Sequence, residues 1–153
     1  MKQEIEVKRI CFDSDEYKLE LELRNELLRK PIGLSVYDED LAKEETDYHI
    51  GAFLNGVLVG CLVLTPISDE EIKMRQVAVR ESLQGFGIGK KLVAYSERVA
   101  QEHGYSKIIL NARIRVAAFY KKLEYEPIGE AFIEDMTGIP HFKMFKHIAA
   151  HAL

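Results

Sequence analysis

The feature that most constrains the fold is a strand–loop–helix–strand segment with a glycine-rich centre. Residues 72–79 have the composition of a strand, residues 90–103 of an amphipathic helix, and residues 106–111 of a second strand. Three glycines directly precede the helix: Gly85, Gly87 and Gly89. The first turn of a helix has backbone N–H groups without intrahelical partners, and it carries the positive end of the helix dipole. The segment therefore predicts a βαβ unit whose central loop binds a phosphate or pyrophosphate.

Two common phosphate-binding motifs do not fit this loop. A P-loop requires Ser or Thr after its Gly-Lys pair, whereas Gly89-Lys90 is followed by Lys91. A dinucleotide fingerprint requires a glycine three residues after its second glycine, and that position holds Lys90. The following strand also lacks the acidic residue that would bind a ribose. A generic nucleotide-binding module is therefore disfavoured.

The segment Gln84-Gly-Phe-Gly-Ile-Gly89 resembles the Gln/Arg-x-x-Gly-x-Gly/Ala signature of the GNAT superfamily of acetyl-CoA-dependent N-acetyltransferases. Met74–Val79 is similar to the Arg-x-x-Ala-Val strand that precedes this signature in the family. Ala117–Pro127 resembles the family's Ala-x-x-Phe-Tyr-x-x-Leu-Gly-Phe segment. The three matches follow the family's order over residues 72–127, and the late segments resemble a poorly characterised bacterial-type subgroup. The first seventy residues match only in pattern.

The resemblance implies an α/β (α+β) chain with the acyl-CoA N-acyltransferase fold and the element order βααβββαβαββ. We expect a central mixed, twisted sheet of six to seven strands with about four helices. The first helix is predicted to run from a cap at 13–15 to about Arg29, with an apolar face of Leu19, Leu23, Leu27 and Leu28. A polar helix or turn follows at 38–45, and Asn55-Gly56 predicts a hairpin between strands 48–54 and 58–64. Late strands are expected at 126–133 and 141–147.

Composition is typical of a compact enzyme. The 153 residues, 47% of them hydrophobic and 30% charged, predict one domain over residues 1–153. A net charge of −4 gives no basic footprint, so we expect no nucleic-acid partner. No signal peptide or membrane span is evident, which predicts a cytoplasmic protein without a membrane partner; a homodimer is left open. Cys11 and Cys61 form no metal or redox motif and are expected to be two buried thiols.

The resemblance also implies how acetyl-CoA binds. Ile72 and Met74 differ in strand parity from Val77 and Val79, so a β-bulge is expected near Arg75-Gln76. In the family a bulge at this place accompanies a splaying of this strand from the next parallel one. Alternatively, helices cover both faces and parity carries no information. The backbone is expected to pair with pantetheine, and the glycine loop to hold the pyrophosphate. The implied coenzyme contacts are Val77, Ala78, Val79, Gln84, Gly85, Phe86, Gly87, Ile88, Gly89, Lys90, Asn111, Arg113 and Phe119.

The implied chemistry is direct attack of a primary amine on the thioester, with no metal. By the motif match Tyr120 is the acid that protonates the leaving thiolate. The family's usual carboxylate aligns near Lys73, so the base is open among Glu71, Glu134, Asp135, His141 and a water. His141 is the preferred site residue, since histidine as a residue type titrates near neutral pH. The acceptor amine is unidentified, and the alternative function is a non-catalytic acyl-CoA-binding or regulatory domain.

Overall fold

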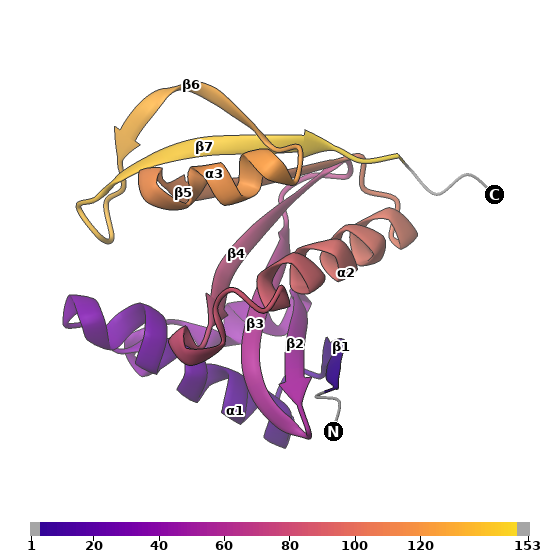
Figure 1. The fold of residues 1–153 in the computed structure, drawn as a ribbon, viewed down its shortest axis with the longest axis vertical. Coiled ribbons are helices and arrows are strands. Elements are labelled where there is room, and N and C mark those ends of the chain that lie inside the picture. The colour runs from indigo at the N-terminus through magenta and orange to yellow at the C-terminus, as the bar shows by residue number, and fades with distance from the viewer. Residues whose placement is uncertain (1–3, 150–153) are drawn as a thin grey trace. The chain divides into compact units, whose positions relative to one another are not determined.

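A computed structural model describes residues 4–149, within which the chain forms seven strands and three α-helices (Figure 1). The strands form one mixed sheet in the order β1-β2-β3-β4-β5-β7-β6, so the predicted sheet is confirmed. The chain divides into two compact units, one built from residues 1–65 and 76–96 and the other from residues 66–75 and 97–153. Strand β4 (Glu71–Val79) contributes residues to both units. A single domain over residues 1–153 stays a prediction.

In the first unit, β1 (Ile5–Ile10), β2 (Tyr48–Leu54) and β3 (Val57–Pro66) form an antiparallel meander. Asn55 and Gly56 join β2 to β3 with φ angles of 50° and 84°. Two successive positive φ angles are typical of a type I′ turn, whose twist matches that of the strands. The predicted hairpin is therefore confirmed.

The first helix begins where Ser14 accepts a hydrogen bond from the backbone N–H of Tyr17 at 3.1 Å. Helix α1 (Asp15–Arg24) continues as a π-helical turn to Arg29, and a 3-10 turn then ends at Gly33 with a φ of 74°. The predicted extent of this helix is confirmed. The polar segment that follows forms two 3-10 turns rather than an α-helix: Val36–Asp38 and Leu41–Thr46.

Three of the four predicted leucines lie on the buried face, since Leu23 is buried and Leu27 and Leu28 pack half-buried against the core. Leu19 is 44% exposed, whereas Glu20 and Arg24 are fully buried together with Leu21 and Leu23. The prediction was wrong for Leu19, because the two charged side chains have buried partners elsewhere in the unit. The thiols also differ from the prediction: Cys61 is buried, but Cys11 is exposed.

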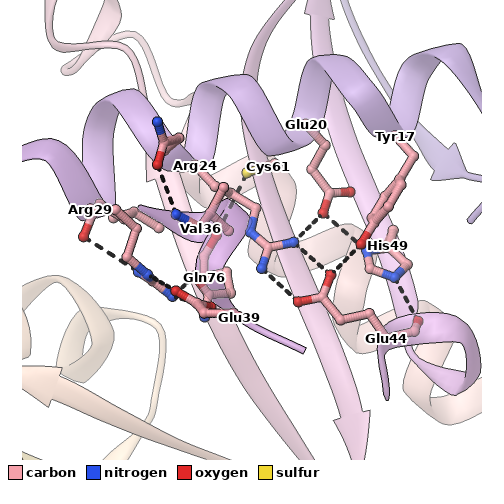
Figure 2. A network of polar contacts seen from close by, with 12 residues as sticks. Tyr17, Glu20, Arg24, Arg29, Val36, Glu39, Glu44, His49, Cys61 and Gln76 are labelled. Carbon is pink, nitrogen blue, oxygen red and sulfur yellow. Dashed lines mark hydrogen bonds and ion pairs between the residues drawn. The ribbon is translucent and has the colours of Figure 1, made fainter. Parts of the chain in front are cut away.

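Those partners form a buried charge network that Figure 2 shows. Arg24 Nη1 donates to Glu20 Oε2 and to Glu44 Oε1, both at 2.8 Å, and Arg24 Nη2 donates to Glu44 Oε2 at 2.7 Å. Tyr17 donates its hydroxyl to Glu44 at 2.8 Å. His49 lies 3.0 Å from Glu20 through Nδ1 and 2.9 Å from the Glu44 carbonyl through Nε2. The network therefore ties α1 to the 3-10 turn at residues 41–46 and to β2.

The network also couples stability to pH. Burial, the largest single effect, disfavours the charged form of His49, but the hydrogen bonds and negative charges of Glu20 and Glu44 together outweigh it and raise the pKa. A raised folded pKa means that protonated His49 stabilises the fold fully below the ordinary value of 6.5. This contribution is lost as the pH rises through the folded pKa.

In the second unit, the start of β4 pairs in parallel with β5 (Lys107–Arg113), and β5 pairs antiparallel with β7 (Pro140–His147). Strand β6 (Glu126–Ile133) lies outside β7, close to the predicted bounds of both late strands. Helix α3 (Ile114–Lys122) and the last turn of α2 (Ile88–Glu102) belong to the same unit. No helix among the described residues is long and apolar enough to cross a membrane.

Both helices of this unit contact the same face of β7. Lys121 of α3 places its Nζ 6.0 Å from the centroid of the Phe142 ring. Glu97 of α2 accepts a hydrogen bond from Lys146 at 3.1 Å. Side chains alternate along a strand, so the even-numbered residues of β7 face these helices and the odd-numbered ones face away.

We expect Arg24→Met to lower the free energy of unfolding by roughly 3–5 kcal/mol, because it leaves Glu20 and Glu44 buried without their cation. Lys18→Met, which removes an exposed pair with Asp15, is the matched control and should cost less than about 1 kcal/mol. Urea unfolding followed by circular dichroism measures both. Equal losses for the two variants would contradict a structural role of the network.

Candidate active site

The glycine loop has the open geometry that phosphate binding requires. Gly85 and Gly87 have φ angles of 93° and 79°, a region that side-chain-bearing residues rarely adopt. A Cβ atom added at either position would meet no atom within 4 Å, so the space beside the loop is free. Gln84 Nε2 donates to the Val79 carbonyl at 3.2 Å and holds the loop against the end of β4.

Helix α2 begins directly after the loop. The Lys91 N–H donates to the Gly87 carbonyl at 3.1 Å, which makes Ile88, Gly89 and Lys90 the first helical turn. Their N–H groups point away from the helix body and are the natural anion donors. Lys90 and Lys91 are exposed and add charge nearby. Ile88 itself is a core residue, 1% exposed, so only its backbone can serve a ligand.

Strand β4 is irregular where the bulge was predicted. Gln76 has a φ of 56°, which is unusual inside a strand. In the strand after Gln76, the side chain of Ala78 is buried, whereas those of Val77 and Val79 are half-buried. Ala78 belongs to the apolar cluster that also contains Cys61 and faces α1, which explains why the smallest of the three residues is the buried one.

Two side chains that the sequence did not identify hold this irregularity (Figure 2). Arg29 donates to Gln76 Oε1 at 2.9 Å and to Glu39 at 2.6 Å. The Cys61 thiol donates to the Gln76 carbonyl at 3.6 Å. The change of parity in the strand was the only signal in the sequence, and it gave no indication of these partners.

In the second unit, the pairing of β4 with β5 is short. Its first pair is Glu71 with Lys107 and its last pair is Lys73 with Ile109. Within the described part of this unit, Met74 has no partner on β5. Strand β5 nevertheless continues its pairing with β7 as far as Arg113. The predicted splaying of β4 from β5 is consistent with this early end of the register.

Tyr120 lies on α3 and is 7% exposed. Its ring contacts Phe119 and Tyr125, with centroid distances of 5.0 and 5.8 Å. Its hydroxyl has no hydrogen-bond partner among residues 4–149, unlike that of Tyr125, which donates to Glu97. Burial raises the pKa of Tyr120 to about 12. The phenol is therefore neutral at physiological pH and keeps its proton available for donation.

Asn111, Arg113 and His141 lie on the other face of the sheet. Asn111 pairs with Lys143 and Arg113 with His141, all at odd-numbered positions, which face away from α3. The expected coenzyme contacts are thus divided in this unit: Phe119 lies on the helix side with Tyr120, and Asn111 and Arg113 lie on the opposite side.

His141 is 4% exposed and well held. Its Nδ1 lies 2.8 Å from the Ile139 carbonyl and its Nε2 lies 3.5 Å from Glu134 Oε2. This places two of the candidate bases in direct contact. Glu71 is less suitable, since it pairs with Lys107 at 3.3 Å at the opposite end of β5. Asp135 is exposed beside Glu134.

A second cluster of ligand-type atoms lies in the first unit. One atom from each of Glu20, Glu44 and His49 falls within 4.8 Å of the others, a spacing that could hold a metal ion. Arg24 already donates to both carboxylates there and supplies the balancing positive charge. The cluster is therefore accounted for as part of the buried network.

The chain belongs to the acetyltransferase (GNAT) family, whose model matches residues 14–125. An uncharacterised N-acetyltransferase of Bacillus subtilis, YitI, is 31% identical over 151 residues, which cover 93% of this chain and 95% of that protein. A Bacillus subtilis relative provisionally named as an acetyltransferase is 35% identical over 98 residues, or 64% of this chain and 65% of that protein. The chain is accordingly an acyltransferase of the N-acetyltransferase type.

The fold of solved structures agrees with this assignment. The structure of an aminoglycoside 6'-N-acetyltransferase complexed with coenzyme A matches 97% of this chain and 99% of its own, with a TM-score of 0.78. At 18% identity this likeness shows the fold alone. The predicted acyl-CoA N-acyltransferase fold is confirmed.

We predict that Gly87→Asp abolishes binding of coenzyme A while the protein stays folded, because it places a carboxylate beside the anion-binding N–H groups. Gly33→Asp is the matched control, since Gly33 has a similar φ of 74° and equally open surroundings. Isothermal titration calorimetry measures the affinity, and circular dichroism verifies folding. An unchanged affinity of the folded Gly87→Asp variant for coenzyme A would contradict the assignment of this loop as the phosphate-binding site.

Proposed function

We propose that this N-acetyltransferase uses acetyl-CoA as its acyl donor and a primary amine as its acceptor. The observation that carries the proposal is the open glycine loop at the start of α2, directly after an irregular strand. Acetyl-CoA and ATP, tested separately by thermal shift, should give opposite results: stabilisation by acetyl-CoA and none by ATP. Release of free thiol in the presence of an amine panel then tests turnover.

The donor is proposed to lie along β4 and the loop. The N–H groups from Gln84 to Lys90 suit its pyrophosphate, and the backbone from Val77 to Val79 suits the pantetheine amides. Backbone N–H and C=O groups of β4 that do not pair with the neighbouring strand would then hydrogen-bond to the ligand. The coenzyme A complex of the structural neighbour supports this choice of donor.

In this proposal the thioester supplies an activated acetyl group, and the protein moves two protons. A neutral amine is already a good nucleophile, so no covalent enzyme residue is required. The leaving thiolate needs a proton, and Tyr120 has a neutral hydroxyl without a protein partner in the described residues. A neutral phenol hydroxyl without a protein partner can donate its proton to a bound ligand. Tyr120 is therefore the proposed acid.

The proton of the attacking ammonium is proposed to leave through the His141–Glu134 pair or through a water that the pair holds. The carbonyl of Ile139 and the carboxylate of Glu134 lie at opposite nitrogens of the imidazole and orient the ring. The rival function, an acyl-CoA-binding domain without turnover, gives no role to the unpartnered hydroxyl of Tyr120. That hydroxyl favours the enzyme over the rival.

Tyr120→Phe should leave coenzyme affinity intact and lower turnover by roughly 10²–10⁴-fold, the usual effect of losing a general acid. Tyr125→Phe is the matched control, because it removes a buried hydroxyl that donates to Glu97 and has no proposed role in the reaction. Its expected effect is on stability alone. Turnover of Tyr120→Phe within about threefold of the parent would make Tyr120 a packing residue and leave protonation to solvent.

His141→Gln should lower turnover by about tenfold or more without changing coenzyme affinity, since it keeps polar atoms in the site but no titratable ring. His147→Gln provides the control, because His147 is exposed at the other end of the same strand. Pre-steady-state and steady-state thiol release separate chemistry from product release. If His141→Gln has native activity over the whole pH range, His141 is structural.

A further inference from the structure

One face of the second unit carries an excess of positive charge. The odd-numbered positions of β4, β5 and β7 face away from α3 and α2. They bring together six polar side chains: Lys73, Arg75, Asn111, Arg113, His141 and Lys143. Glu134 is a carboxylate that acts on Lys73, and it already pairs with His141.

Two of these cations stand apart from the other lysines of the same strands. Lys107 pairs with Glu71 at 3.3 Å, and Lys146 pairs with Glu97 at 3.1 Å. Lys73 and Lys143 have neither a hydrogen bond nor an ion pair among residues 4–149. Lys107 and Lys146 are therefore neutralised by ion pairs, whereas Lys73 and Lys143 have no ion-pair partner among the described residues.

The environment of Lys73 shows that the charges act on one another. Its pKa is lowered, first by burial, next by the positive charge of Arg75 and also by that of Lys143, against an opposing contribution from Glu134. A half-buried ammonium among other cations is costly unless an anion completes the group. Such an arrangement is typical of a binding site for an anion.

The spacing of the strands allows both lysines to contact one small ligand. Lys73 pairs with Ile109 on β5, and Lys143 pairs with Asn111, one step farther along the same face. Strand geometry puts the two lysine Cα atoms on the order of 12 Å apart, with β5 between them. A group above Asn111 is thus within reach of both ammonium groups and of the amide.

We propose that the acceptor of this enzyme is an amine that also bears an anionic group, a carboxylate or a phosphate monoester, held by Lys73 and Lys143. The inference rests on the proposed function and names its substrate class. In the transfer, the amine nitrogen bonds to the acetyl carbon and the carbon–sulfur bond breaks. One proton leaves the nitrogen and one reaches the sulfur. Nearby cations favour the neutral, nucleophilic form of the amine. They also oppose polycationic acceptors such as aminoglycosides.

The test compares acceptors that differ only in the anion. Amino acids are paired with their carboxamides, and O-phosphoethanolamine with ethanolamine, under saturating acetyl-CoA. We expect kcat/KM to be at least about tenfold higher for the anionic member of the preferred pair, the size of one or two favourable charge contacts. The pair that shows the preference identifies carboxylate or phosphate as the anion. Added salt should reduce the preference.

Substitutions test the two lysines directly. Lys73→Met and Lys143→Met should each reduce the preference to less than about threefold, mainly through KM of the anionic acceptor. Lys122→Met is the matched control, because Lys122 is an exposed lysine on α3 and lies on the helix-covered side. It should keep the full preference. Equal kcat/KM within every pair, or a preference that survives both substitutions, would overturn the inference.

A binding measurement separates this inference from the proposed function. With coenzyme A present in excess, succinate should raise the melting temperature of the parent protein but not that of the double variant Lys73→Met/Lys143→Met. Failure of acetyl-CoA to bind would refute the proposed function. Normal binding of acetyl-CoA with turnover of neutral or cationic amines only, and no effect of succinate, would refute the anionic acceptor alone.

Discussion

The interruption of strand β4 is the constraint on which the candidate site depends. A strand in the middle of a sheet normally has both edges paired, because unpaired backbone groups are costly when buried. Here the register with β5 ends at Lys73, and Gln76 adopts a left-handed backbone. A regular strand would leave no main-chain groups for the pantetheine that we propose to bind there. The irregular strand stores strain that the surrounding side chains must hold.

The first unit provides that support through buried polar contacts rather than through apolar packing alone. Arg29 bonds to the Gln76 side chain, and Cys61 bonds to its carbonyl. One helical turn earlier, Arg24 joins α1 to Glu44 in the segment that leads to β2. Breaking such a network leaves buried charges without partners, so the helix has few alternative positions. The same helix therefore fixes both the sheet and the shape of its irregular strand.

Local chemistry explains why the sequence predicted some features well. The Asn55-Gly56 turn, the Ser14 cap and the glycines of the loop each depend on the backbone preferences of one or two residues. The sheet was predicted through the family resemblance as much as through periodicity. Sequence patterns were less informative where partners are distant in the chain. Leu19 matched a helical stripe but is exposed, because Glu20 and Arg24 find partners 29 and 20 residues away.

The placement of site residues was predictable only in part. Tyr120 could be named from its motif, but the absence of a protein partner for its hydroxyl within residues 4–149 required the structure. The face on which Asn111 and Arg113 lie follows from the register of β5 with β7, which no single-sequence pattern specifies. Lys73 appeared in the sequence only as a departure from the family's carboxylate. In the structure it is one of several cations on a shared face.

The two faces of the second unit suggest how one fold serves different acceptors. The helix-covered face holds Tyr120, whose proposed task of protonating a thiolate is the same whatever amine reacts. The opposite face holds Lys73, Lys143 and Arg113, none of which is needed for that proton transfer. Residues on this face can change in charge without disturbing the helices, since their side chains do not pack against them. A carboxylate at position 73 would attract ammonium groups, whereas a lysine there would favour acceptors that bring their own negative charge, as we propose for this chain.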